Sequence, residues 1–315
     1  MSELGKIEDG EEMREKIILD TDMLTDCDDL AAMAILHKLA DYGEVDILAT
    51  VVSSKHPKSA AVVDVVNCYY GRGNMPIGAP KNGAGVYKGH SVFLEPVSNE
   101  FPHSVMTNET VPDAVYVYRE VLSKAADSSV VIVTIGYMSN LAVLLKSEPD
   151  GFSELNGCDL VEQKVKHWVC MGGNFPVDSA GDNVNFTRDG EAAFYAINNW
   201  PGEIIFVGRE IGHNIFIGDR FRSMDESNPV RRAYQLHREK AGKSDWNHHT
   251  ADPCTILFAV RGLRDYWTMS EYGYLDLKED CSFEWVESPD GNQRYVFQKM
   301  DRGLLGEIME EVLIK

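Results

Sequence analysis

The chain has 315 residues, of which 44% are hydrophobic, and it carries a formal net charge of −20 at pH 7. This length and composition allow a large buried core, whereas no segment reaches the ~18 apolar residues that a membrane span needs. The acidic charge argues against nucleic acid, whose phosphates need a basic protein surface, so we expect a protein that binds neither nucleic acid nor membranes.

The chain begins with a polar, acidic stretch. Residues 1–15 contain no apolar segment of the kind found in secretory signals, and we expect them to form a flexible tail. The six cysteines form neither a CxxC motif nor a Cys/His zinc spacing, which favours reduced thiols in a cytoplasmic protein. No internal repeat or linker follows, so we expect a single domain that spans residues 16–315.

Strand patterns alternate with helix patterns along most of this domain. Buried strands are predicted at residues 17–19, 45–52, 129–135, 166–171 and 203–207. Helices are predicted at residues 30–36, 59–70, 112–124, 189–198, 228–242 and 252–261, and one more begins at residue 140. Such alternation is typical of βαβ units. The predicted fold class is therefore α/β, with an open, mainly parallel sheet flanked by helices.

Two regions depart from this alternation. Residues 80–110 lack periodicity and carry several glycines, which predicts a lid-like loop or a disordered excursion. Near the end of the chain, short strand patterns at residues 272–277, 283–287 and 294–299 are joined by turns. We expect these to form a small antiparallel ribbon appended to the main sheet.

Five aspartates lie within ten residues, directly after the first predicted strand and before the first helix. They are Asp20, Asp22, Asp26, Asp28 and Asp29. Like charges at this density repel one another unless a cation neutralises them, and carboxylate oxygens are the ligands that Ca²⁺ and Mg²⁺ prefer. In open α/β sheets the carboxyl ends of the strands are also where ligands bind. The cluster therefore indicates a divalent-metal site.

Three later segments are placed to reach the same edge of the sheet, because each follows a strand or precedes a helix. They are residues 134–136, 182–185 and 251–253. An aspartate at a helix start, such as Asp252, also serves as an ordinary N-cap, and taken alone that role is the more common one.

Taken together, these segments resemble the calcium-dependent nucleoside hydrolases of the inosine–uridine-preferring type. Asp20-Thr21-Asp22 and Asp28-Asp29-Leu30-Ala31 are similar to the D-x-D and D-D of the opening signature, although five residues separate them where the best-known members have three. The other matching segments are residues 71–77, 133–142, 171–173, 185–193 and 252–253. The resemblance covers roughly residues 16 to 265.

The resemblance implies a site for Ca²⁺ and a nucleoside substrate. The implied metal ligands are Asp22, Asp29, the main-chain carbonyl of Ile135, and Asp252. The implied substrate contacts are Asp28, Asn174, Asn183 and Asn185. In this scheme Asp22 activates the water that attacks an N-ribosidic bond, and Asp20 orients the loop. A homodimer or homotetramer is also implied.

The chain departs from the family pattern at the sugar and base ends of the site. Ala251 stands where active members often carry the histidine that protonates the leaving base, and Asn183 stands where they carry a glutamate. His249 is the candidate for the leaving-group acid, with neighbouring His248 as the other, because an imidazole titrates near neutrality. The alternative, that both are exposed loop histidines without a role in the reaction, stays open and is the more common case. Asp26 remains open between a ribose contact and a helix cap.

Three functions remain open at this point. The first is a Ca²⁺-dependent hydrolase that cleaves the N-glycosidic bond of a ribonucleoside or of a modified ribonucleoside. The second is a ribosyl-ligand binder, or a weakly active relative, that keeps the metal site but has an altered pocket. The third and least favoured is a Mg²⁺-dependent phosphohydrolase, because D-x-D after a strand also opens that class.

Overall fold

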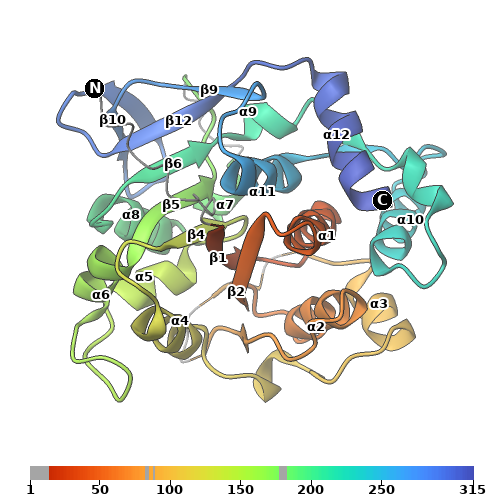
Figure 1. The fold of residues 1–315 in the computed structure, drawn as a ribbon, viewed down its shortest axis with the longest axis horizontal. Helices are drawn as coiled ribbons and strands as arrows, with labels where there is room; N and C mark the ends of the chain where they lie inside the picture. The colour runs from red at the N-terminus through yellow and green to blue at the C-terminus, as the bar shows by residue number, and fades with distance from the viewer. Residues whose placement is uncertain (1–13, 82–84, 88, 177–182) are drawn as a thin grey trace, which may run out of the picture.

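The computed structural model describes residues 14–81, 85–87, 89–176 and 183–315 (Figure 1). Residues 1–13 of the expected tail lie outside this description, and the first strand begins at Glu15. None of the described helices is long and apolar enough to cross a membrane.

A ten-stranded sheet runs through the described part of the chain in the order β11-β10-β12-β6-β5-β4-β1-β2-β3, with β9 paired to β12. Its strands are β1 (Glu15–Thr21), β2 (Val45–Val52), β3 (Ile77–Gly78), β4 (Val130–Thr134), β5 (Val165–Met171), β6 (Ile204–Val207), β9 (Trp267–Met269), β10 (Gly273–Leu277), β11 (Phe283–Glu287) and β12 (Gln293–Gln298). The strands that follow one another across the sheet in the order β6-β5-β4-β1-β2-β3 all pair in parallel, which confirms the predicted fold class.

The C-terminal strands extend this sheet. β10 and β11 pair antiparallel, as do β9 and β12, which confirms the predicted ribbon. β12 pairs in parallel with β6, so the ribbon continues the main sheet directly. A separate two-stranded pair is formed by β7 (Phe216–Ile217) and β8 (His248–His249).

Helices cover both faces of the sheet. They are α1 (Asp28–Asp41), α2 (Ser59–Tyr69), α3 (Leu94–Glu100), α4 (Ala114–Lys124), α5 (Ser139–Leu145), α6 (Gly157–Lys164), α7 (Val184–Thr187), α8 (Gly190–Asn199), α9 (Arg209–Gly212), α10 (Pro229–Lys240), α11 (Ala251–Arg261) and α12 (Arg302–Ile314). Two short 3₁₀ helices are η1 (Asn108–Thr110) and η2 (Asp219–Ser223).

The two faces of the sheet belong to two hydrophobic cores. Successive side chains of a strand point to opposite faces, so Val131 and Val133 of β4 pack with α1, α2, α10, α11 and α12, whereas Val130 and Ile132 pack with α4, α5, α6 and α8 (Figure 1). All five residues of β4 are buried, which explains its continuous β-branched sequence.

The expectation of an aperiodic region over residues 80–110 was wrong in part. Residues 94–100 form α3 and residues 108–110 form η1. Phe93, Leu94 and Val97 are fully buried, and α3 packs on α2 and α10. Tertiary burial of these few apolar side chains, rather than a long periodic pattern, therefore holds the short helix in place. Residues 82–84 and 88 lie outside the described chain.

Candidate active site at the carboxyl edge of the sheet

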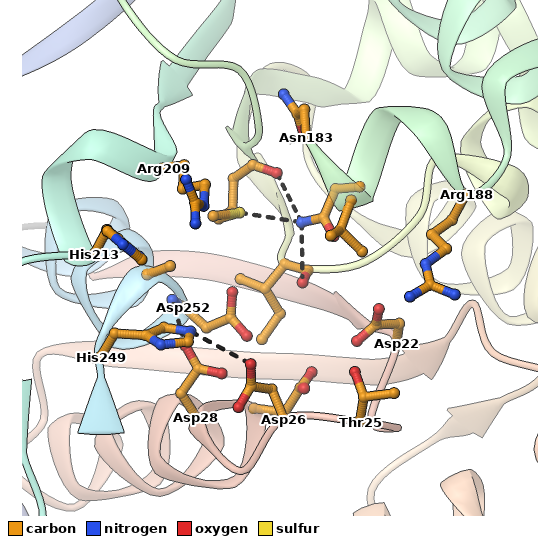
Figure 2. A pocket seen from close by; sticks show the side chains of 16 residues that line it. Asp22, Thr25, Asp26, Asp28, Asn183, Arg188, Arg209, His213, His249 and Asp252 are labelled. Carbon is orange, nitrogen blue, oxygen red and sulfur yellow. Dashed lines mark hydrogen bonds and ion pairs between the residues drawn. The ribbon is translucent and has the colours of Figure 1, made fainter. Parts of the chain in front are cut away.

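A cavity of about 220 Å³ opens where β1, β4 and β5 end. Its lining residues are Asp22, Thr25, Asp26, Asp28, Asp29, Ile135, Met171, Asn183, Val184, Asn185, Arg188, Arg209, His213, His249, Ala251 and Asp252. The labelled aspartates gather on one side of it, and Asn183 and Arg209 lie on the other (Figure 2). The edge predicted from the strand ends is therefore the edge that carries the cavity.

The first turn of α1 contributes Asp28 and Asp29, which are only 2% and 1% exposed. The partial positive charge of a helix N-terminus favours carboxylates at this position. Asp29 is held in place because Oδ1 accepts hydrogen bonds from the hydroxyl of Thr21 and, at 3.1 Å, from the main-chain N–H of Met23. The loop after β1 thus orients Asp29 before any ion binds.

Asp28, Asp29 and Asp252 form an acidic cradle, in which one oxygen from each residue lies within 4.8 Å of the others. Asp252 is the second residue of α11, where Thr250 is the N-cap, so it does not act as the ordinary cap that its position suggested. The main-chain N–H of Asp252 donates to Oδ2 of Asp28 at 3.3 Å, which ties α11 to α1.

The electrostatics of the cradle favour a bound cation. Burial raises the pKa values of Asp29 and Asp252 well above the usual range, and repulsion from neighbouring aspartates raises them further. Buried carboxylates are costly when nothing compensates their charge, and an all-oxygen set is the chemistry of hard divalent ions. The donor set therefore fits a divalent metal ion.

Asp22 and Ile135 line the same cavity as the cradle. Asp22 is 8% exposed, and burial, together with the charges of Asp28 and Asp26, raises its pKa to about 7 against opposing effects of Tyr137 and Arg188. The carbonyl of Ile135 accepts a hydrogen bond from Nδ2 of Asn185 at 3.4 Å. Of the four metal ligands implied by the resemblance, Asp29 and Asp252 belong to the cradle. The other two, Asp22 and Ile135, line the same cavity.

The expected substrate contacts divide into two groups. Asp28, Asn183 and Asn185 line the cavity, whereas Asn174 is half-buried and does not belong to the lining formed by the described residues. Asn185 also donates to the carbonyl of Met171 at 3.1 Å, so it bridges the ends of β4 and β5. The Nδ2 atom of Asn183 is buried and has no hydrogen-bond partner in the described chain.

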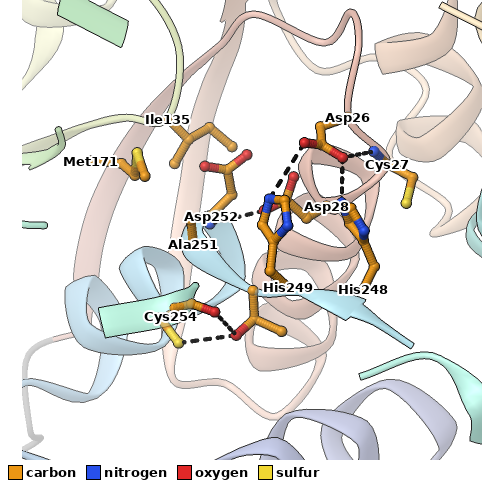
Figure 3. Close-up of polar contacts among 12 residues, drawn as sticks. Asp26, Cys27, Asp28, Ile135, Met171, His248, His249, Ala251, Asp252 and Cys254 are labelled. Atoms are coloured by element: carbon orange, nitrogen blue, oxygen red, sulfur yellow. Dashed lines mark hydrogen bonds and ion pairs between the residues drawn. The ribbon is translucent and has the colours of Figure 1, made fainter. Parts of the chain in front are cut away.

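Asp26 pairs with histidines rather than capping α1, whose N-cap is Cys27 without a side-chain cap bond. Oδ2 of Asp26 lies 3.3 Å from Nε2 of His249, and Oδ1 contacts Nε2 of His248 (Figure 3). Although burial acts to raise it, hydrogen bonds from His248 and His249 hold the pKa of Asp26 below its usual range. The cap interpretation is therefore wrong.

His249 lies beside both the cavity and the cradle. Its Nε2 is 4.0 Å from Oδ2 of Asp28. Burial acts to lower the pKa of His249, but the hydrogen bond that its ring donates to Asp26 and the charge of Asp28 outweigh it and raise the value to about 9. This shift favours the imidazolium form, which is the form that a general acid needs.

The sequence patterns missed two cationic side chains of the cavity, Arg188 and Arg209. The charge of Arg188 acts to lower the pKa of Asp22, so its guanidinium faces the cradle side of the cavity (Figure 2). Arg209 begins α9 with one residue between it and the end of β6, and ligands of α/β sheets bind at such strand ends, so its position could have indicated it. His213 also lines the cavity.

Comparisons with known proteins agree with this geometry. The family model for the inosine-uridine preferring nucleoside hydrolase matches residues 17–283. A search of curated proteins found no match.

Solved structures share the fold over nearly the whole chain. A plant nucleoside hydrolase, PpNRh1, has a TM-score of 0.71 at 18% identity, covering 96% of this chain and 99% of its own. The inosine-uridine preferring nucleoside hydrolase of Bacillus anthracis has a TM-score of 0.69 at 15% identity, covering 95% and 99%. The type III effector protein XopQ, solved with adenosine diphosphate ribose, has a TM-score of 0.65 at 15% identity, covering 96% and 92%. By the match of its sequence, this chain belongs to the inosine-uridine preferring nucleoside hydrolase family of N-glycosyl hydrolases.

Proposed function

We propose that this protein hydrolyses the N-glycosidic bond of a ribonucleoside, with Ca²⁺ held by Asp22, Asp29, Asp252 and the carbonyl of Ile135. One observation carries the proposal. A single cavity joins the acidic cradle to Asp22 and to His249, whose pKa is raised, so a base, a metal site and an acid can surround one space of small-molecule size. The family match supports the same reaction class.

The residues divide the chemistry between them. When bound, the ion would orient and acidify the attacking water. Asp22 accepts the proton from that water at a carboxylate oxygen, because it lines the cavity beside the cradle. Asp28, Asn183 and Asn185 hold the sugar by its hydroxyl groups. Asp28 also belongs to the cradle, so it borders both the ion and the sugar.

His249 completes the reaction at the other end of the bond. Asp26 holds Nε2 of His249, so we assign to the departing base the proton at Nδ1. A protonated base is a far better leaving group than its anion. In this scheme His249, which lies on strand β8, takes the role of the histidine that active family members often carry at the position of Ala251.

A second candidate is a ribosyl-ligand binder with little turnover. Arg188 and Arg209 bring positive charge to the cavity, which would suit an anionic ribosyl compound. The bound adenosine diphosphate ribose of XopQ, a structural neighbour, makes that compound a natural probe. We rank hydrolysis first, because the family match supports it and because binding alone does not need a carboxylate base and an imidazole in the same cavity.

Ribose release from a panel of purine and pyrimidine nucleosides tests the proposal, with adenosine diphosphate ribose included. We expect release from at least one nucleoside in the presence of Ca²⁺ and loss of release with EGTA. No release from any compound, with thermal stabilisation by adenosine diphosphate ribose, would favour the binder. We also propose a cytoplasmic homodimer or homotetramer, whose mass light scattering coupled to gel filtration would measure.

A further inference from the structure

Behind His249 lies a second group of metal-binding side chains, distinct in chemistry from the cradle. Asp26, Cys27, His237 and His248 each offer one donor atom, and the four atoms all lie within 4.8 Å of one another. We call this group the His–Cys cluster. It joins the loop before α1, helix α10 and strand β8, so no spacing along the sequence could reveal it.

The donors of the His–Cys cluster point to a borderline-soft ion. Two imidazole nitrogens, a thiol and a carboxylate are the ligand types of tetrahedral zinc sites, whereas hard ions such as Ca²⁺ take oxygen alone. Cys27 is fully buried and the His248 side chain is 9% exposed, so water competes little for these positions. A thiolate and a carboxylate would together neutralise a divalent cation.

Asp26 connects this cluster to the cavity through its two oxygens. Oδ1 contacts Nε2 of His248, lies 3.7 Å from Nε2 of His237 and accepts the main-chain N–H of Cys27 at 3.2 Å. Oδ2 faces His249 instead, at 3.3 Å. Figure 3 shows the carboxylate of Asp26 between His248 and His249. An ion at Oδ1 would therefore fix the group that orients His249.

Tyr234 gives an independent indication of an unsatisfied site. The residue is fully buried, its hydroxyl has no hydrogen-bond partner among the described residues, and its ring lies edge-on to His248 at 6.4 Å between centroids. Burial raises the pKa of Tyr234, and the nearby charges of Cys27 and Asp28 raise it further, which places the hydroxyl close to the cluster. An unpaired buried hydroxyl is costly, and a ligating thiolate or carboxylate would accept a hydrogen bond from it.

We propose that Asp26, Cys27, His237 and His248 bind a zinc-class transition-metal ion, separate from the calcium site. Its role is positional: it holds the loop before α1 against α10 and β8, and it fixes the carboxylate that pairs with His249. The competing arrangement is a metal-free hydrogen-bonded network of the same side chains, which would bind zinc no better than any surface histidine pair.

Metal analysis of the full-length protein, purified without chelators and then incubated with Zn²⁺ and desalted, tests this directly. We expect stoichiometric zinc in the wild type. Replacement by Co²⁺ should give the near-ultraviolet charge-transfer band of a cobalt thiolate. Cys27→Ser should abolish that band and weaken zinc binding by more than ~10-fold, since a lost ligand costs at least as much as a lost supporting group. Cys254→Ser changes a buried thiol outside the cluster and should keep both zinc and the band.

Two further variants keep the result interpretable. His237→Gln alters the more exposed ligand, whose side chain is 20% exposed, and should also lose zinc if Cys27→Ser does not fold. Asp252→Asn changes the cradle and should retain zinc, so failure of the calcium proposal would not mimic failure of this one. Absence of zinc from the wild type, or a cobalt–thiolate band that persists in Cys27→Ser, would overturn the proposal.

Discussion

Gly136 packs directly on the backbone of Asp22. A Cβ atom at residue 136 would lie 2.3 Å from the main-chain nitrogen of Asp22 and 2.7 Å from Oγ of Ser53. Those are backbone and buried atoms that cannot step aside cheaply. The turn after β4 therefore sets the position of the residue to which we assign the catalytic proton transfer.

Gly136→Ala should consequently damage catalysis more than folding. Overpacking of this kind costs ~1–3 kcal/mol of stability. Displacement of a catalytic group by ~1 Å can cost ~10²-fold in rate. Thermal unfolding and kcat/KM for ribose release would measure the two effects. Gly151→Ala is the matched control, because a Cβ there meets no atom within 4 Å. Equal activity in both variants would argue against Asp22 as the base.

Asp22→Asn removes the proposed base while keeping the size of the side chain. General-base catalysis contributes ~10²–10⁴-fold, and we expect kcat to fall by that range. Asp46→Asn serves as the control, since Asp46 on β2 forms an exposed ion pair with Arg14 and is not among the described residues that line the cavity. Because Asp22 is also a proposed ligand, kcat should be measured at saturating Ca²⁺. Full activity of Asp22→Asn there would refute its role.

Calcium should stabilise the fold as well as support turnover. An ion that binds only the folded state adds ~2.7 kcal/mol at 100 times its Kd. Differential scanning fluorimetry with Ca²⁺ or EGTA would show a higher Tm with the ion in the wild type. Asp252→Asn should lose most of that difference, because it removes one oxygen ligand and one charge from the cradle. A Tm that Ca²⁺ leaves unchanged would contradict the metal assignment.

His249→Ala separates leaving-group protonation from the other roles of the site. With a natural nucleoside we expect a loss of ~10²-fold or more. In a nitrophenyl riboside the leaving group, nitrophenolate, departs without needing a proton. Hydrolysis of this substrate should therefore change little in the same variant. His213→Ala, which alters another histidine of the cavity, should not show this contrast. Equal losses on both substrates would mean that His249 positions the substrate instead.

The sheet was predictable because its central strands have a strong local signal. β4 is a continuous β-branched run, and the five predicted strands all appear in the structure. Helix α12 was missed, although Leu305, Met309 and Leu313 follow one another at the four-residue spacing of a buried helical face. This spacing alone could have predicted the helix.

The site was predictable only where position along a strand determines it. Asp22, Ile135 and Asp252 follow strand ends or begin a helix, and the parallel sheet brings such positions together. The pairing of Asp26 with histidines depends on how α10 and β8 pack against α1, which no local pattern encodes. Arg188 illustrates the same limit, since a pattern places its backbone but not the direction of its side chain.

His37 predicts how stability depends on pH. Nδ1 of His37 faces Nη1 of Arg72 at 3.4 Å and must accept from it, while Nε2 pairs with Oδ1 of Asn67 at 2.9 Å and must donate. The ring is 1% exposed and stacks on Tyr70. Burial, followed by the charge of Arg72, lowers the pKa of His37 to about 4 from its ordinary value of 6.5. The folded state therefore needs the neutral ring.

Between pH 6.5 and pH 4 the unfolded chain binds more protons at His37 than the folded chain does, so the free energy of unfolding rises with pH across this window. Acidification from pH 7 to pH 4 should cost on the order of 3 kcal/mol from this group alone. Urea unfolding at several pH values would measure the slope. His37→Gln should flatten it, whereas the exposed His90→Gln should leave it as it is in the wild type. A slope that His37→Gln does not change would show that other groups, and not this buried ring, set the acid limit of the fold.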